Sequence, residues 1–150
     1  MRQVWISKAG PPEVLQVRHA PEPQPGPGQV RVAVEAIGVN FADIVGRLGV
    51  YADAPRIPFV PGFEVAGRID AVGAGVDPAR LGQEVLALTR FGGYSEMICV
   101  PASHALPRPP TLTVEQAAAF PVAALTAYAA LEVLARVQEG DRVLIHAAAG

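Results

Sequence analysis

A run of alternating residues decides the fold: Val30-Arg31-Val32-Ala33-Val34-Glu35-Ala36. Every second position from Val30 to Val34 is a valine, and side chains two residues apart on a strand lie on the same face of a sheet. The run therefore predicts a strand with one buried face. Further strands are predicted from short apolar runs between glycine and proline turns, at Arg2–Lys8, Leu15–His19, Glu64–Val72, Glu84–Leu88 and Tyr94–Val100. Many short strands of this kind are typical of a small barrel or sandwich.

Breaker residues set the connections between these strands. Ala9-Gly10-Pro11-Pro12 is a turn signal that would join the first two strands into a hairpin. Prolines recur between Pro21 and Gly28, and proline has no N–H for a sheet ladder, so this stretch predicts an extended surface loop. One helix is predicted over Asn40–Leu48, where apolar residues recur at helical spacing, and Gly49 is expected to end it.

The pattern changes after Pro110. Thr113-Val114-Glu115-Gln116 is a capping-box pattern, which predicts the start of a helix that runs to about Val137 with a break near Pro121. A short apolar strand is then predicted at Arg142–His146, followed directly by Ala147-Ala148-Ala149-Gly150. A strand that leads into small residues and glycine is the entrance to a dinucleotide fold, where a pyrophosphate approaches backbone N–H groups.

Composition excludes several classes of function. The net charge is −2 and the sequence has no basic block, so nucleic-acid binding is not expected. Cys99 is the single cysteine, which excludes an internal disulfide and argues against a thiolate zinc site. The apolar stretch Ala117–Leu131 is shorter than the roughly 20 residues of a membrane span, and the N-terminus lacks the apolar core of a signal peptide. A cytoplasmic protein without a membrane span is expected.

Blocks of residues spread along the whole chain resemble one known family. The blocks are Ala36–Asp43, Arg47–Tyr51, Pro61–Gly67, Val72–Val76, Gly82–Val85, Gly92–Glu96, Ala124–Tyr128 and Gly140–Ile145. In their order and spacing they look like the zinc-independent quinone oxidoreductase branch of the medium-chain dehydrogenase/reductase superfamily.

The resemblance implies a fold. It is mostly β with helices, with a GroES-like β-barrel catalytic domain over residues 1–120 and the start of a Rossmann-type α/β domain over residues 121–150. Members of that branch carry NADPH between the two domains, with NADH as a possible substitute, and form homodimers when full length. The chain is therefore expected to be the front part of such an enzyme.

The same resemblance argues against zinc. Asn40 stands where zinc-dependent relatives have a cysteine ligand, and Phe63 stands where they have a histidine, while Glu64 is retained. A lone carboxylate does not make a zinc site. No metal is expected in this chain.

Two interpretations stand beside each candidate site residue. Asn40 is a favourable helix N-cap, and the resemblance places its amide beside the nicotinamide ribose or the substrate carbonyl. Asp43 is a first-turn acid that suits the helix dipole, or a residue that arranges the cleft. Tyr51 is a half-buried ring with a wet hydroxyl, or a cleft wall that stacks on a flat substrate. Arg47 is a cation at a helix end, with a substrate role as the second interpretation.

The cofactor contacts implied by the resemblance lie nearer the C-terminus. Thr126 either bonds a carbonyl one turn back in its helix or contacts the nicotinamide. Gly150 and the backbone of Ala148 and Ala149 would approach the cofactor phosphates.

The resemblance implies hydride transfer from NADPH to a quinone or an α,β-unsaturated carbonyl, with Asn40 and Tyr51 orienting the acceptor oxygen. Two alternatives stay open. One is a non-catalytic, nucleotide-binding adaptor, whose relatives share the Asn-Phe-Ala-Asp form of the first block. The other is that residues 1–150 alone are an inactive piece that binds NADPH weakly or not at all.

Overall fold

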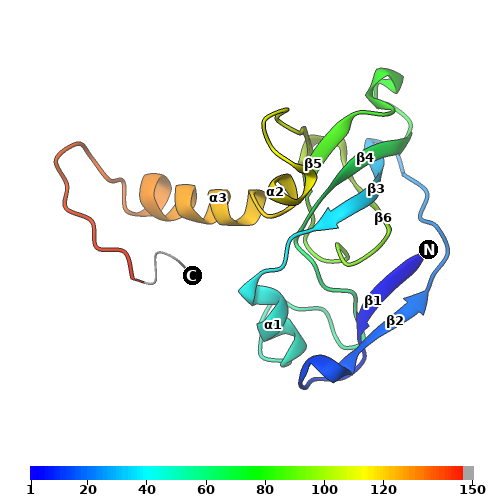
Figure 1. Cartoon of the computed structure of the whole chain (residues 1–150), viewed down its shortest axis with the longest axis horizontal. Coiled ribbons are helices and arrows are strands. Elements are labelled where there is room, and N and C mark those ends of the chain that lie inside the picture. The colour runs from blue at the N-terminus through cyan, green and yellow to red at the C-terminus, as the bar shows by residue number, and fades with distance from the viewer. Residues whose placement is uncertain (147–150) are drawn as a thin grey trace.

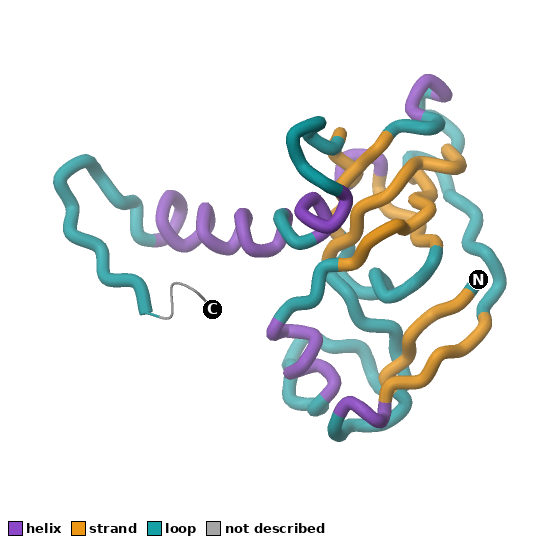
Figure 2. Tube along the Cα trace, in the orientation of Figure 1, coloured by secondary structure: helices purple, strands orange, loops and turns teal. Residues whose placement is uncertain are grey.

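The computed structural model of the chain describes residues 1–146. Its strands form two antiparallel sheets, which Figures 1 and 2 show beside each other. Strands β1 (Arg2–Ile6) and β2 (Leu15–His19) pair as the predicted hairpin. The second sheet has five strands in the order β6-β3-β4-β5-β7. Their bounds are Gln29–Ile37 for β3, Glu64–Val72 for β4, Glu84–Leu88 for β5, Met97–Pro101 for β6 and Ala105–Pro107 for β7. Short 3-10 turns lie at Pro12–Val14 (η1), Pro78–Arg80 (η2) and Ala102–His104 (η3).

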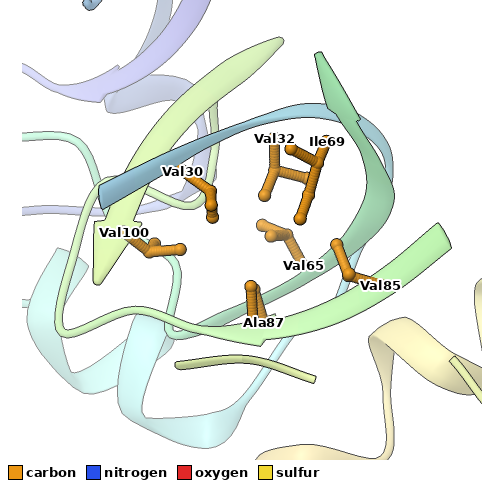
Figure 3. Packing of buried hydrophobic residues seen from close by; sticks show 8 residues of the cluster. Val30, Val32, Val65, Ile69, Val85, Ala87 and Val100 are labelled. Carbon is orange, nitrogen blue, oxygen red and sulfur yellow. The ribbon is translucent and has the colours of Figure 1, made fainter. Parts of the chain in front are cut away.

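The five-stranded sheet curls around an apolar core (Figure 3). Val30 and Val32 of β3 are fully buried, and Val34 packs against them at the edge of the core, as their alternation predicts. The other core residues come from the four neighbouring strands: Val65, Ile69, Val85, Ala87, Val100 and Ala105. Burying a valine contributes at least about 1.5 kcal/mol, so this cluster is the main source of stability for the sheet.

The opposite face of the sheet is covered by α2 (Val114–Ala118). Ala117 and Ala118 pack on Ala66 and Leu86, and these small side chains let the helix approach the strands closely. The predicted capping box forms at the helix start. The Thr113 hydroxyl accepts the Gln116 N–H at 3.2 Å, and the Gln116 side-chain oxygen accepts the Thr113 N–H at 2.9 Å.

Helix α1 (Phe41–Arg47) follows β3 and has Asn40 as its N-cap. Gly49 ends it as predicted, with a φ of +76°. The N–H of Gly49 bonds the Gly46 carbonyl at 3.0 Å and the N–H of Val50 bonds the Val45 carbonyl at 3.2 Å, which together make a Schellman motif.

Helix α3 (Pro121–Tyr128) follows α2 after the predicted break at Pro121 and continues as one π-helical turn, η4 (Ala129–Leu134). The helical stretch thus ends at Leu134, before the expected Val137. Helix α3 projects away from the sheet in Figure 1 and buries only Pro121 among its residues. Its larger apolar side chains are exposed, among them Leu125 and Tyr128.

Several strand predictions need correction. Strand β1 ends at Ile6, two residues before the expected Lys8. Strand β6 begins at Met97, three residues after the expected Tyr94, because the N–H and carbonyl of Tyr94 bond Pro61 and Val4 instead. Strand β7 was not predicted. The expected strand at Arg142–His146 does not form, since the described residues bring no neighbouring strand beside it to pair with its backbone.

The fold class expected from the sequence, mostly β with helices, is confirmed over residues 1–146. The division into domains near residue 120 stays a prediction. Among the described residues, no helix combines the length and the apolar character that crossing a bilayer requires.

Candidate active site

Glu64, the first residue of β4, connects the start of α1 to the start of α3. One carboxylate oxygen of Glu64 accepts a hydrogen bond from the Asn40 side-chain amide at 2.8 Å. The other oxygen accepts the backbone N–H of Val122 at 2.7 Å. Glu64 is 1% exposed, so both of its acceptors are satisfied inside the protein.

Asp43 ties α1 to the segment before β4. Its two carboxylate oxygens accept the backbone N–H groups of Asn40 at 2.9 Å and of Gly62 at 3.0 Å. Burial raises the pKa of Asp43 above its ordinary value, and these hydrogen bonds, with one from the Tyr94 phenol, offset part of that effect. Asp43 therefore fastens the backbone at Asn40 to the backbone at Gly62.

Tyr94 was missed as a site residue because nothing in its glycine-rich sequence context marks it. Burial is the main cause that raises the pKa of its phenol, and the charge of Asp43 adds to it. The ring packs closely on Gly62: a Cβ added at Gly62 would lie 2.6 Å from the Tyr94 Cδ1 atom. Gly62 also has a φ of +106°, so this position requires glycine for two reasons.

A row of aromatic rings includes Phe63, the residue before Glu64 in the chain. The rings of Tyr51 and Phe63 meet edge to face with centroids 6.0 Å apart. Phe63 in turn contacts Phe91 at 5.1 Å, and Phe91 contacts Phe59 at 5.7 Å. Tyr51 is half-buried and also lines a hollow of about 270 Å³ between the end of α1 and the loop that follows it.

The structure brings some of the predicted site residues together. Asn40 and Asp43 are in direct contact, and Tyr51 contacts Phe63, the neighbour of Glu64 in the chain. Thr126 is exposed and lies one turn along α3 from Val122. Ala148, Ala149 and Gly150 lie outside the described residues.

Arg47 takes a structural position at the end of α1. Its guanidinium donates to the Gly10 carbonyl, and the Gly10 N–H donates to the Arg47 carbonyl at 3.1 Å. This pair fastens the helix to the loop after β1, and no substrate role for Arg47 is needed to explain it.

The residues at the two positions compared with zinc ligands make no metal cage. Phe63 is part of the aromatic row, and the Asn40 amide is bonded to Glu64. Within residues 1–146 there is no group of three or more histidine, cysteine or acidic side chains that could hold a metal ion.

A larger groove of about 350 Å³ lies elsewhere, along β1, β3 and the segment Tyr94–Glu96. Among the site residues named above, only Tyr94 lines it. The groove therefore meets the site at Tyr94 and does not include Asn40, Asp43 or Glu64.

Residues 26–110, more than half of the chain, match the family model described as "Alcohol dehydrogenase GroES-like domain". Among curated proteins, the chain is 44% identical over 136 residues to the rat (Rattus norvegicus) "Synaptic vesicle membrane protein VAT-1 homolog", covering 91% of this chain and 34% of the relative. It is 38% identical over 152 residues to the rat "Quinone oxidoreductase", covering 100% of this chain and 46% of the relative. The chain thus spans about a third to a half of the length of these relatives.

Two solved structures resemble the chain closely. The mycobacterial protein Rv1454c complexed with NADPH superposes with a TM-score of 0.91 at 40% identity, covering 100% of this chain and 46% of that one. The CurK enoyl reductase superposes with a TM-score of 0.92 at 35% identity, covering 99% of this chain and 47% of that one.

Proposed function

The chain belongs to the alcohol dehydrogenase GroES-like domain family, within the medium-chain dehydrogenase/reductase superfamily, and from this membership we propose a function for the protein that contains it. The protein reduces quinones or α,β-unsaturated carbonyls by hydride transfer from NADPH, without zinc. Residues 1–120 form the domain that receives the substrate, and the cofactor domain begins within residues 121–150.

The observation that carries this proposal is the cluster around Glu64. It places an amide, Asn40, and a helix, α3, on the two oxygens of one buried carboxylate. The edge-to-face pair of Phe63 and Tyr51 lies next to it in the chain. An amide donor and aromatic rings are the groups that suit a flat, carbonyl-bearing acceptor such as a quinone.

The residues present fit the nicotinamide end of NADPH. A primary amide has two N–H groups and a carbonyl oxygen. One N–H of Asn40 is used on Glu64, which leaves the carbonyl oxygen for a hydroxyl of the cofactor ribose and the second N–H for the acceptor. Thr126 presents an exposed hydroxyl on α3, and the apolar Phe41 beside Asn40 is 76% exposed. We assign Asn40 and Thr126 to the cofactor side of the site, with Ala148, Ala149 and Gly150 near the phosphates. When bound, NADPH supplies the hydride.

The chain's own residues orient the acceptor and steady its charge. The second N–H of Asn40 donates to the acceptor oxygen, where negative charge develops during reduction. The Tyr51 ring stacks on the acceptor, and its hydroxyl bonds the same oxygen. Asp43 holds the Asn40 backbone and so keeps the amide in place. The last proton comes from water or a hydroxyl.

Turnover by the full-length protein tests this function. NADPH oxidation is measured with a 1,4-quinone, a 1,2-quinone and an enone as acceptors. Oxidation of NADPH that depends on at least one acceptor is expected. Binding of NADPH without oxidation in the presence of every acceptor would contradict the proposal.

A non-catalytic, nucleotide-binding role is the second candidate. It is supported by the 44% identity to the vesicle membrane protein homologue and by the exposed apolar side chains of Phe41, Ile44 and Leu48 along α1. Tight NADPH binding with no turnover in the assay above would favour it over the reductase.

A further inference from the structure

Glu64 fixes the orientation of the Asn40 amide, because its carboxylate can only accept a hydrogen bond. A carboxylate oxygen only accepts hydrogen bonds, so the end of the Asn40 side chain that faces Glu64 must be its NH2 group. The amide carbonyl of Asn40 is then turned the other way. Glu64 thereby decides which atoms of Asn40 face the carboxylate and which are left for a ligand.

The second carboxylate oxygen of Glu64 accepts a backbone N–H at the start of α3 that has no acceptor within the helix. Val122 is in the first turn of α3, where backbone N–H groups have no acceptor within the helix. Glu64 accepts this N–H from a neighbouring strand, at 2.7 Å. Since α3 buries only Pro121 among its own residues, this bond is one of few that fix the helix to the sheet.

Gly38 provides the space that the carboxylate occupies. A Cβ added at Gly38 would lie 2.3 Å from a carboxylate oxygen of Glu64 and 2.4 Å from the Ala118 carbonyl oxygen. No real Cβ sits at such distances, so any side chain here would displace Glu64 or α2. The segment between β3 and α1 is thus shaped to leave Glu64 in place.

We propose that Glu64 is a positioning residue that sets the orientation of the Asn40 amide and the placement of α3 together. It links the acceptor-binding amide to the helix that carries Thr126, so that the two move as one unit. The catalytic meaning of this link rests on the proposed function. The link itself does not, because it concerns hydrogen bonds between residues of this chain.

Exchanging the donor at position 40 and the acceptor at position 64 tests the link between Asn40 and α3 in the full-length protein. Asn40→Asp alone faces Glu64 with a second carboxyl group that has no N–H to donate. The pair shares a proton at low pH and its members repel once that proton is lost, so exchange is followed as the pH is raised to about 9. Adding Glu64→Gln restores both bonds with reversed roles: the new glutamine NH2 donates to the carboxylate introduced at position 40, and the glutamine oxygen accepts the Val122 N–H. Glu64→Ala removes both acceptors. Glu35→Gln, at an exposed position on β3, is the matched control for loss of one acidic charge.

Hydrogen–deuterium exchange of the Val122 amide is the first readout. Exchange about tenfold faster is expected in Asn40→Asp and in Glu64→Ala, with Glu35→Gln unchanged. The double variant should return exchange to within about threefold of the unmodified protein. A double variant no better protected than Asn40→Asp would overturn the proposal, whereas a side chain that only fills space would show no such rescue.

NADPH oxidation is the second readout, and it separates the two claims. Turnover should stay low in the double variant although α3 is protected again, because its carboxylate at position 40 cannot donate the hydrogen bond that the proposed function uses. Normal turnover there would contradict the role of Asn40 and leave the positioning role of Glu64 standing. If the unmodified protein shows no turnover, the exchange measurements still decide the positioning role.

Discussion

Asp43 is a carboxylate held in a place that favours its uncharged form. It is 6% exposed, and burial raises its pKa although two backbone N–H groups bond it. A group whose pKa is higher in the folded than in the unfolded protein adds stability below its unfolded pKa. That contribution is lost as the pH rises through the folded pKa.

The pH dependence of stability should therefore change in an Asp43→Asn variant. Asparagine does not titrate, so only the unmodified protein gains stability at this position as the pH falls from about 7 to about 4. As the pH falls over that range, the unfolding free energy of the unmodified protein should rise relative to that of Asp43→Asn. Urea denaturation at a series of pH values measures it. A difference that stays constant or shifts toward the variant would show that the pKa of Asp43 is not raised.

The hydroxyl and the ring of Tyr51 have separable roles. Tyr51→Phe keeps the edge-to-face contact with Phe63 and should leave the unfolding free energy within about 0.5 kcal/mol. Its kcat/KM should fall about fivefold through loss of one hydrogen bond to the acceptor. Tyr51→Leu loses the ring contact as well and should cost about 1 kcal/mol of stability. An unchanged kcat/KM in Tyr51→Phe would remove the hydroxyl from the mechanism.

At the scale of elements, α1 inverts the usual arrangement of an amphipathic helix. The apolar spacing of Phe41, Ile44 and Leu48 correctly predicts the helix, yet these side chains are at least 40% exposed while Asp43 and Gly46 are buried. Periodicity finds a helix without telling which face is covered. The buried face is set by two long-range hydrogen bonds, from the Gly62 N–H to Asp43 and from the Asn40 amide to Glu64, which no local pattern encodes.

Strands, too, are predicted well where the signal is local and poorly where distant contacts decide. Those with a local apolar signal, such as β4 and β5, were predicted with the bounds that the structure shows. The start of β6 was not, because Tyr94 bonds segments that are distant in the sequence. At the site, the sequence predicted Asn40 and Asp43 but not the bond of Asn40 to Glu64 or that of Asp43 to Tyr94, since each of these contacts joins residues more than twenty positions apart.

The Schellman motif at the end of α1 gives a test at this scale. Gly49→Ala should destabilise the protein by about 1 kcal/mol from its positive φ alone. The new Cβ would also lie 3.0 Å from the Cβ of Ala9, which adds to the cost. Gly75→Ala is the matched control, with a φ of +80° and open space around it. Chemical denaturation should give the larger loss for Gly49→Ala, and an equal or smaller loss would contradict this packing.

At the scale of the whole molecule, the low content of charged residues goes with many apolar side chains exposed at the surface. Hydrophobic residues make up 51% of the chain and charged residues 17%. The exposed apolar side chains gather on α1, on α3 and on the segment after it, and include Phe41, Val50, Phe120, Leu134 and Leu144. Many apolar side chains therefore lie outside the buried core of the five-stranded sheet, on or next to α1 and α3 and on the segment after α3.

We propose that the full-length protein reduces its acceptor with NADPH and without a metal. The most direct test is NADPH oxidation by the full-length protein after exhaustive treatment with a zinc chelator, with a quinone or enone acceptor and metal analysis of the same sample. Turnover should persist unchanged in metal-free protein, and added zinc should not raise it. Turnover that disappears on chelation and returns with zinc would contradict this proposal.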